Sequence, residues 1–231
     1  MKNPLTNCYL CGKPEDSHFT RDHIPPKGLF LGPRPNNLIT VPCCFECNQK
    51  HSGFDERLRI IASMSFDRND VGQRIVDEKV VGSTFAQNRQ IKFAEQLAGS
   101  LLAVADQPAL FRVGRGIDNR EFSDGMIQIT KGLLFALHPN LNYHELIFTP
   151  ISIRQQPSKN QLRLMTGLIL GEYLELGQGV FQCWRKVAES RKRGVWMLVF
   201  YECYGYFVFH QSASDCNTWN CCDTSVAGKI F

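Results

Sequence analysis

The sequence predicts an α+β fold, and three observations carry this prediction. Two C-x-x-C pairs lie within the N-terminal quarter of the chain. Apolar residues then recur at helical spacing, and after Asn142 β-branched and aromatic runs alternate with turn-forming clusters. We therefore expect a small cysteine-rich module in residues 1–55, a helical segment in 56–112 that packs on it, and an antiparallel sheet with a packed helix in 113–231.

The composition of the 231 residues is that of an ordinary globular protein, with 43% hydrophobic and 21% charged residues. A formal net charge of +4 permits a nucleic-acid partner without requiring one. The N-terminal MKNPLTNCYL has no apolar run after its lysine, so we expect no secretory signal and a cytoplasmic location. The longest apolar stretch, residues 195–209, contains Glu202 and Gly205 and is too short to cross a membrane as a helix.

The two C-x-x-C pairs predict a structural zinc site formed by Cys8, Cys11, Cys44 and Cys47. A pair of thiols separated by two residues grips one metal ion from a tight turn, and two such pairs complete a tetrahedral four-thiolate shell. Cys43 offers another register, but only Cys44 has the two-residue spacing to Cys47. Cys43 and the remaining cysteines are therefore expected to stay thiols in a reducing cytoplasm.

Polar residues that a purely structural zinc site does not need lie between and after the two cysteine pairs. Asp22-His23 comes first, Asn37-Leu38 follows, and Asn48 stands directly after the second pair. In this order the D-H, N-L and C-x-x-C-N motifs resemble the HNH endonuclease family, whose ββα-metal site is commonly embedded in a zinc-binding treble clef. The resemblance covers about the first fifty residues and implies a zinc-stabilised HNH nuclease module there.

The resemblance also implies a role for each of these residues. His23 matches the general base, Asn37 matches the residue that orients it, and Asp22 and Asn48 match the ligands of a catalytic magnesium or manganese ion. Phosphodiester hydrolysis needs a deprotonated water and a divalent cation, so an imidazole and hard oxygen ligands suit the reaction. Many family members carry histidine in place of Asn48. We interpret the asparagine as a variant ligand set and rank His51, one helical turn further on, as a lesser candidate.

Local composition predicts a hairpin with a long loop. Residues 19–21 are expected to form a first strand leading to Asp22-His23, and residues 38–41 a second. Between them, IPPKGLFLGPRPN contains four prolines and two glycines, which predicts an irregular loop across which substrate lies. Basic residues in this region are candidate phosphate contacts, with solvated surface charge as the alternative: Arg21, Lys27, Arg34 and Lys50.

Helical periodicity dominates the middle of the chain. A helix should begin at Asn48 and run through DERLRIIASMSF, with a break near Ser52-Gly53. Two further helices are expected between about residues 69 and 105, the second with an apolar stripe of the core-facing kind. After an exposed loop at 114–125, residues 126–138 again have helical spacing.

Four β-branched and aromatic runs predict the strands of the sheet: residues 145–153, 161–170, 179–189 and 194–210. The basic segment WRKVAESRKRG is either a DNA-contacting arm or, as we favour, a soluble turn. The aromatic residues of the last run either stack bases or, as we favour, form sheet core. His210 with Cys216, Cys221 and Cys222 is a candidate second metal site, although its spacing fits no zinc pattern well.

These observations predict a metal-dependent HNH endonuclease that hydrolyses DNA phosphodiester bonds. Three alternatives remain: a treble clef that binds nucleic acid or protein without catalysis, activity in the C-terminal domain, and RNA as the substrate. A homodimer would place two sites on opposite DNA strands. The C-terminal domain could bind an activating ligand or partner, which would suit a bacterial or phage defence nuclease.

Overall fold

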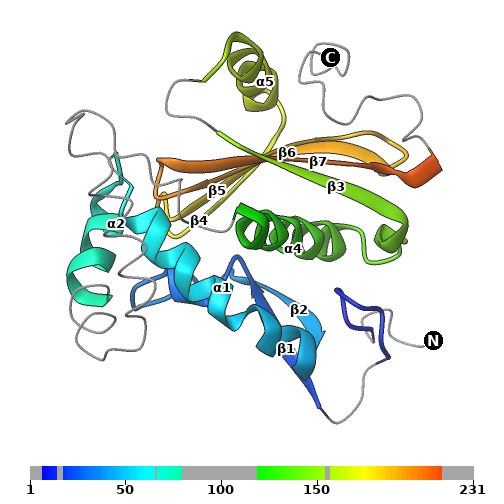
Figure 1. Ribbon diagram of the computed structural model, residues 1–231, viewed down its shortest axis with the longest axis horizontal. Helices are drawn as coiled ribbons and strands as arrows, with labels where there is room; N and C mark the ends of the chain where they lie inside the picture. The colour runs from blue at the N-terminus through cyan, green and yellow to red at the C-terminus, as the bar shows by residue number, and fades with distance from the viewer. Residues whose placement is uncertain (1–6, 15–17, 66, 80–118, 154–156, 215–231) are drawn as a thin grey trace.

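The computed structural model describes residues 7–14, 18–65, 67–79, 119–153 and 157–214. In this part of the chain the protein is a mixed α/β structure with four α-helices and an antiparallel sheet. Figure 1 shows the elements in layers: helix α5, the sheet, helix α4, and then the N-terminal hairpin with helix α1. The α+β class predicted from the sequence is therefore confirmed.

The N-terminal layer begins with a hairpin that leads straight into a helix. Strands β1 (Phe19–Ile24) and β2 (Ile39–Cys44) pair antiparallel, and α1 (Phe45–Ser63) follows β2 without a loop. Both strands are longer than predicted, so Asp22 and His23 lie within β1. Helix α1 continues through Ser52 and Gly53 without the expected break, because its apolar residues keep helical spacing and bury one face.

The loop between β1 and β2 is irregular apart from one 3-10 turn, η1 (Lys27–Leu29). Leu29 is fully buried, and its carbonyl accepts a hydrogen bond of 2.8 Å from the Tyr201 hydroxyl in the distant C-terminal half. Helix α2 (Asp70–Ile75) is also tied to that half, because the backbone N–H of Asn69 donates to the carbonyl of Tyr201. The second helix predicted before residue 105 lies outside the described residues.

Helix α4 (Asn119–Leu137) begins well before the predicted residue 126, so the expected loop at 114–125 is wrong for residues 119–125. Two glycines within α4 allow it to pack closely against the N-terminal layer. A Cβ at Gly125 would lie 2.0 Å from the Phe54 ring, and one at Gly132 would lie 2.5 Å from Ile24. Glycine lets the backbone of α4 approach α1 and β1 more closely than any other residue would.

The sheet has five antiparallel strands in the order β3-β7-β6-β5-β4. Their bounds are β3 (Leu146–Ser152), β4 (Glu172–Leu176), β5 (Phe181–Val187), β6 (Arg193–Phe200) and β7 (Tyr204–Ser212). A 3-10 turn, η3 (Tyr143–Glu145), joins α4 to β3. Helix α4 covers one face and α5 (Lys159–Ile169) lies over the other (Figure 1). The predicted antiparallel sheet with a packed helix is confirmed.

The strand predicted at residues 161–170 is wrong, because this segment forms α5. Leu164 and Leu168, four residues apart, are buried on the side facing the sheet, which is helical and not strand spacing. Ser158 begins the helix through a capping box with Gln161: the Ser158 hydroxyl accepts from the Gln161 N–H, and the Gln161 side chain accepts from the Ser158 N–H.

One hydrophobic core runs through the hairpin, α1, α4 and the facing side of the sheet. The large aromatic residues Trp196, Phe200 and Phe207 are almost fully buried, which favours the core interpretation of the aromatic run over base stacking. None of the described helices combines the length and apolar character needed to span a bilayer.

Candidate functional site

The four cysteines come from two local structures. Cys8 and Cys11 lie in a tight turn closed by two backbone hydrogen bonds of 2.8 Å, Gly12 N–H to the Cys8 carbonyl and Cys8 N–H to the Lys13 carbonyl. Gly12 has φ +72°, a conformation that favours glycine. Cys44 ends β2 and Cys47 lies in the first turn of α1.

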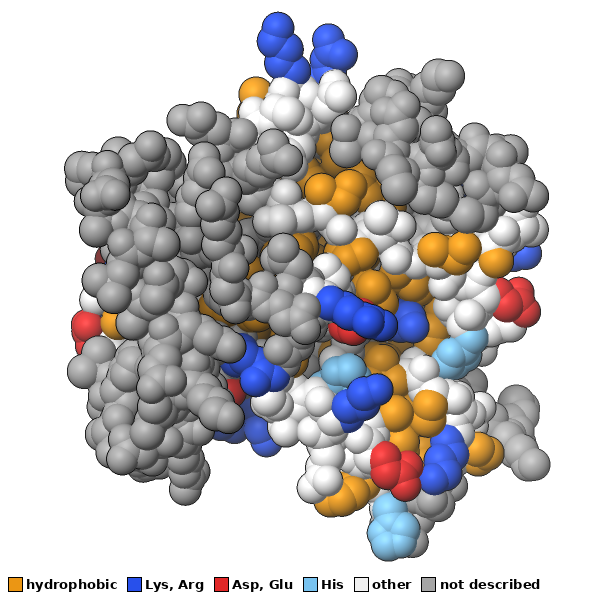
Figure 2. Space-filling model, viewed as in Figure 1, with side chains coloured by type: hydrophobic (Ala, Val, Ile, Leu, Met, Phe, Trp, Pro, Cys, Tyr) orange, Lys and Arg blue, Asp and Glu red, His pale blue; other side chains and the backbone are white. Residues whose placement is uncertain are grey.

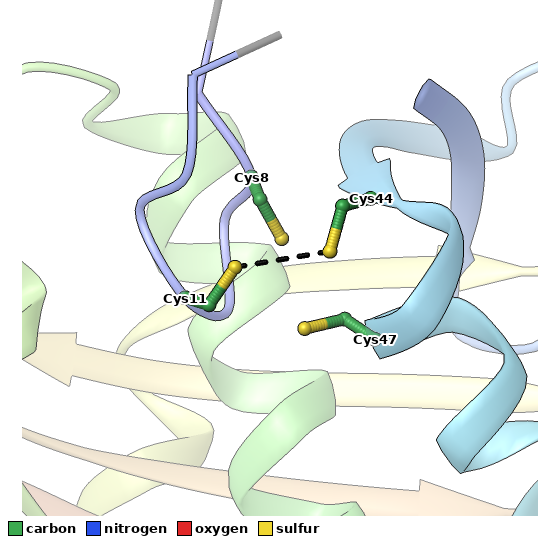
Figure 3. A group of neighbouring side chains, drawn as sticks. All are labelled: Cys8, Cys11, Cys44 and Cys47. Carbon is green, nitrogen blue, oxygen red and sulfur yellow. Dashed lines mark hydrogen bonds between the residues drawn. The ribbon is translucent and has the colours of Figure 1, made fainter. Parts of the chain in front are cut away.

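Their sulfur atoms converge on one point, as Figure 3 shows. All four lie within 4.8 Å of one another, and the Cys11 and Cys44 sulfurs are 3.8 Å apart. A tetrahedral zinc site with Zn–S bonds of about 2.3 Å places its sulfurs about 3.8 Å apart. The donor set and its spacing therefore fit a structural zinc ion, as the sequence predicted.

Cys43 contacts the four-cysteine cluster, which the sequence did not predict. It is fully buried in β2, and its thiol hydrogen-bonds to Cys8, which lowers the pKa of Cys8 to about 3. A lowered pKa favours the thiolate, the form in which cysteine binds metal. Cys43 remains a thiol because the same contact and its burial raise its pKa.

Asp22, the predicted ligand of the catalytic ion, is buried and hydrogen-bonded from two directions. Its Oδ2 accepts a hydrogen bond of 2.6 Å from the Tyr9 hydroxyl and one of 3.2 Å from Gln128 Nε2. Tyr9 comes from the cysteine turn and is anchored to β2 through its N–H, which donates to the Pro42 carbonyl. Gln128 comes from α4, so three segments far apart in sequence meet at this carboxylate.

Asn48, the second predicted ligand, lies in the first turn of α1 and reaches β1. Its Nδ2 donates a hydrogen bond of 3.0 Å to the Thr20 hydroxyl. Thr20 and Asp22 are two residues apart on a strand, so they lie on the same face of β1. The two predicted ligands therefore approach the same face, and the amide oxygen of Asn48 is the atom left for a cation.

His23 is partly exposed, and its pKa is lowered from the ordinary histidine value. Burial is the main cause, and the positive charges of Lys27 and Arg34 add to it, while Asp22 opposes it. A lowered pKa keeps the imidazole neutral near pH 7, the form that accepts a proton. Asn37 is exposed two residues before β2, and within the described chain it makes no hydrogen bond to His23.

The predicted phosphate contacts lie on the surface. Arg21, Lys27, Arg34 and Lys50 are all exposed. Of these, Lys27 and Arg34 are close enough to His23 to affect its pKa. In the face drawn in Figure 2, several Lys, Arg and His side chains lie over the lower part of the molecule, with acidic side chains beside some of them.

Two further titratable residues lie near Asp22 on the face of α1 that carries Asn48. His51 and Asp55 follow Asn48 at helical spacing. Burial and the negative charge of Asp22 raise the pKa of Asp55 to about 7. Burial lowers the pKa of His51, although Asp22 acts to raise it.

Sequence reasoning missed Tyr9, Gln128 and Asp55. Asp55 had a local signal, because it lies seven residues after Asn48 and therefore on the same helix face. Tyr9 lies between two predicted zinc ligands in the sequence. This position indicates that it lies near the cysteine cluster but not which residue its hydroxyl contacts. Gln128 is 106 residues from Asp22, and nothing in a single sequence connects the two positions.

His210 is not available as a ligand for the second metal site predicted from the sequence. His210 is buried, its Nδ1 accepts a hydrogen bond of 2.9 Å from Trp196 Nε1, and its Nε2 lies 3.2 Å from the Arg191 carbonyl. With both ring nitrogens engaged, His210 is a core residue and not a ligand. The cysteines at 216, 221 and 222 lie outside the described residues. In the basic segment, Arg185 forms an ion pair with Glu172, which neutralises part of the positive charge of the segment within the sheet.

Comparison of the chain with protein-family models, with curated proteins and with solved structures finds no match. The function must therefore be inferred from the residues and their arrangement.

Proposed function

We propose that this protein is a metal-dependent endonuclease of the HNH type that hydrolyses DNA phosphodiester bonds. One observation carries the proposal: the buried, hydrogen-bonded Asp22 carboxylate lies on β1 beside His23, whose pKa is lowered, and Asn48 reaches from α1 to the strand face that carries Asp22. The four-cysteine cluster stabilises the same hairpin and helix from the other end.

The donor chemistry of the site suits a hard divalent cation. Asp22 and Asn48 would hold magnesium or manganese through a carboxylate and an amide oxygen. Asp55 adds a second carboxyl group near Asp22, and its pKa is raised mainly by burial and further by the negative charge of Asp22. A cation bound there would offset this negative charge, and when bound it would neutralise charge on the scissile phosphate.

His23 takes the proton of the attacking water in the proposed mechanism. Its lowered pKa leaves the imidazole unprotonated at neutral pH, and its partly exposed position gives water and substrate access. Lys27 and Arg34 would contact phosphates on either side of the scissile bond, because they lie near His23 and keep exposed charges.

The exposed Asn37 favours a second candidate function, a zinc treble clef that binds nucleic acid or protein without cleaving it. In the HNH reading Asn37 should orient His23, but the two side chains are not hydrogen-bonded in the described chain. An RNA substrate, a homodimer, a cytoplasmic location, a defence role and an activator of the C-terminal domain remain predictions from the sequence.

Plasmid cleavage tests the proposal. Zinc-loaded wild type, His23→Ala and a matched surface control, His18→Ala, are incubated with supercoiled DNA, with and without magnesium or manganese. We expect cleavage that needs the added metal, survives in His18→Ala and disappears in a folded His23→Ala protein. Binding without cleavage by the wild type would support the non-catalytic function. Cleavage that persists in His23→Ala would show that the base is misassigned, and a parallel single-stranded RNA substrate tests the choice of nucleic acid.

A further inference from the structure

Helix α4 belongs to the C-terminal half but presents one face to the proposed nuclease module. Gly125, Gln128 and Gly132 follow one another at spacings of three and four residues, which places them on a single helix face. The two glycines bring the α4 backbone against Phe54 of α1 and Ile24 of β1. Gln128 lies between these close approaches, where it is directed at β1.

In this position Gln128 contacts the Asp22 carboxylate, and its side chain also interacts with the Tyr9 hydroxyl. Only 6% of its surface is exposed, and its Nε2 donates to Asp22 Oδ2 at 3.2 Å. Within the described part of the chain its Oε1 has no hydrogen-bond partner. A buried amide oxygen without a hydrogen-bond partner lowers the stability of the fold. The presence of glutamine at this position is therefore explained better by its contact with Asp22 than by packing.

Tyr9 donates to the same carboxylate oxygen as Gln128 does. Its hydroxyl donates to Asp22 Oδ2 at 2.6 Å, and its ring is held by α4, with its centroid 6.5 Å from that of Phe135. Two donors on Oδ2 fix the rotation of the carboxylate and leave Oδ1 as the oxygen for a cation. Partners of this kind set the orientation of a ligand and its affinity for metal.

We propose that Gln128 is a positioning residue of the active site, so that the C-terminal half, through α4, orients the metal-binding carboxylate of the N-terminal module. This inference rests on the proposed function. Loss of an orienting partner of a metal ligand typically weakens metal binding about 10-fold to 100-fold. The module is then incomplete without α4, although the HNH motifs all lie within the first fifty residues.

Manganese binding to the zinc-loaded full-length protein, measured by calorimetry without DNA, tests the inference. Gln128→Met removes the donor and keeps the size of the side chain. Thr130→Val is the matched control, because Thr130 is also buried in α4, and its hydroxyl donates to the Met126 carbonyl of its own helix and not to β1 in the described residues. Asp22→Asn removes the proposed carboxylate ligand and so shows whether manganese binds at the proposed metal site. Zinc content and melting temperature report the folding of each variant.

We expect wild type to bind manganese, Asp22→Asn to lose binding, Gln128→Met to bind about 10-fold to 100-fold more weakly, and Thr130→Val to match wild type. If Asp22→Asn loses binding but Gln128→Met matches Thr130→Val, the positioning role is wrong and the proposed function stands. If wild type binds no manganese, or Asp22→Asn binds as tightly, the metal site of the proposed function fails and the inference fails with it. Should Gln128→Met not fold, Gln128→Leu removes the same donor with a side chain of similar size, and unchanged manganese affinity in that variant would equally overturn the inference.

Discussion

Asp55 offers a quantitative test of the electrostatics around Asp22. It lies on α1 with its carboxyl group partly buried near Asp22, and these two causes raise its pKa to about 7 from the ordinary value of 3.8. Because the folded protein binds the proton more tightly than the unfolded chain does, the free energy of unfolding decreases as the pH rises from about 4 to about 7. Above about pH 7 the ionisation of Asp55 changes the free energy of unfolding no further.

The substitution Asp55→Asn removes the ionisation and should stabilise the protein increasingly as the pH is raised. Between pH 5 and pH 7 the folded wild type keeps its proton while the unfolded chain has lost it. This interval of about two pKa units, at about 1.4 kcal/mol each, corresponds to about 2 to 3 kcal/mol. We therefore expect the advantage of the variant over wild type to be larger by about that amount at pH 8 than at pH 5.

Urea unfolding of zinc-loaded protein at the two pH values, without added magnesium or manganese, measures this difference. Glu56→Gln is the control, because Glu56 lies next in sequence on α1 but is more exposed and pairs with Arg59 at 3.8 Å. Its effect should be small and similar at both pH values. Equal stabilisation by Asp55→Asn at pH 5 and pH 8 would refute the claim that Asp55 is held protonated by burial near Asp22.

Three further predictions concern packing, zinc and nucleic acid. Gly125→Ala should lower the free energy of unfolding by about 1 to 3 kcal/mol, because the new Cβ would lie 2.0 Å from the Phe54 ring, whereas Gly28→Ala, whose nearest neighbour would be 3.9 Å away, should change little in the same urea titration. Cys47→Ser should abolish zinc binding in metal analysis and lower the melting temperature, because a structural zinc site contributes directly to folding; retention of zinc would exclude Cys47 as a ligand. Lys27→Ala and Arg34→Ala should each weaken DNA binding and reduce the salt slope by about 1 in gel-shift titrations, and unchanged slopes would mean that neither residue contacts phosphate.

Features that depend on short sequence separations could be predicted. The C-x-x-C spacing brings Cys8 and Cys11 into one turn whatever the rest of the chain does, and the D-H and N-L motifs mark the hairpin that β1 and β2 form. The difference at residues 161–170 is also local. Ser158 and Gln161 carry a capping-box signal that predicts the start of a helix, whereas the apolar composition of the residues that follow is also typical of a strand.

Features that depend on contacts between distant segments could not be predicted. Gly125 and Gly132 lower helix propensity by themselves, and only the presence of Phe54 and Ile24 across the interface explains why α4 carries them. The hydrogen bond from Gln128 to Asp22 likewise joins residues 106 positions apart. The cysteine cluster was therefore predictable from its spacing, whereas the residues that contact Asp22 required the tertiary structure.

The position of α4 between two layers has a consequence for how the protein unfolds. On one side the helix contacts β3 and β7, and on the other it contacts β1, β2 and α1. Neither half can lose α4 without exposing its own core to water, so both halves should melt together in a single cooperative transition. Release of zinc and exposure of the buried Trp196 should then occur in the same transition. Disruption of the cysteine cluster should therefore also destabilise the sheet.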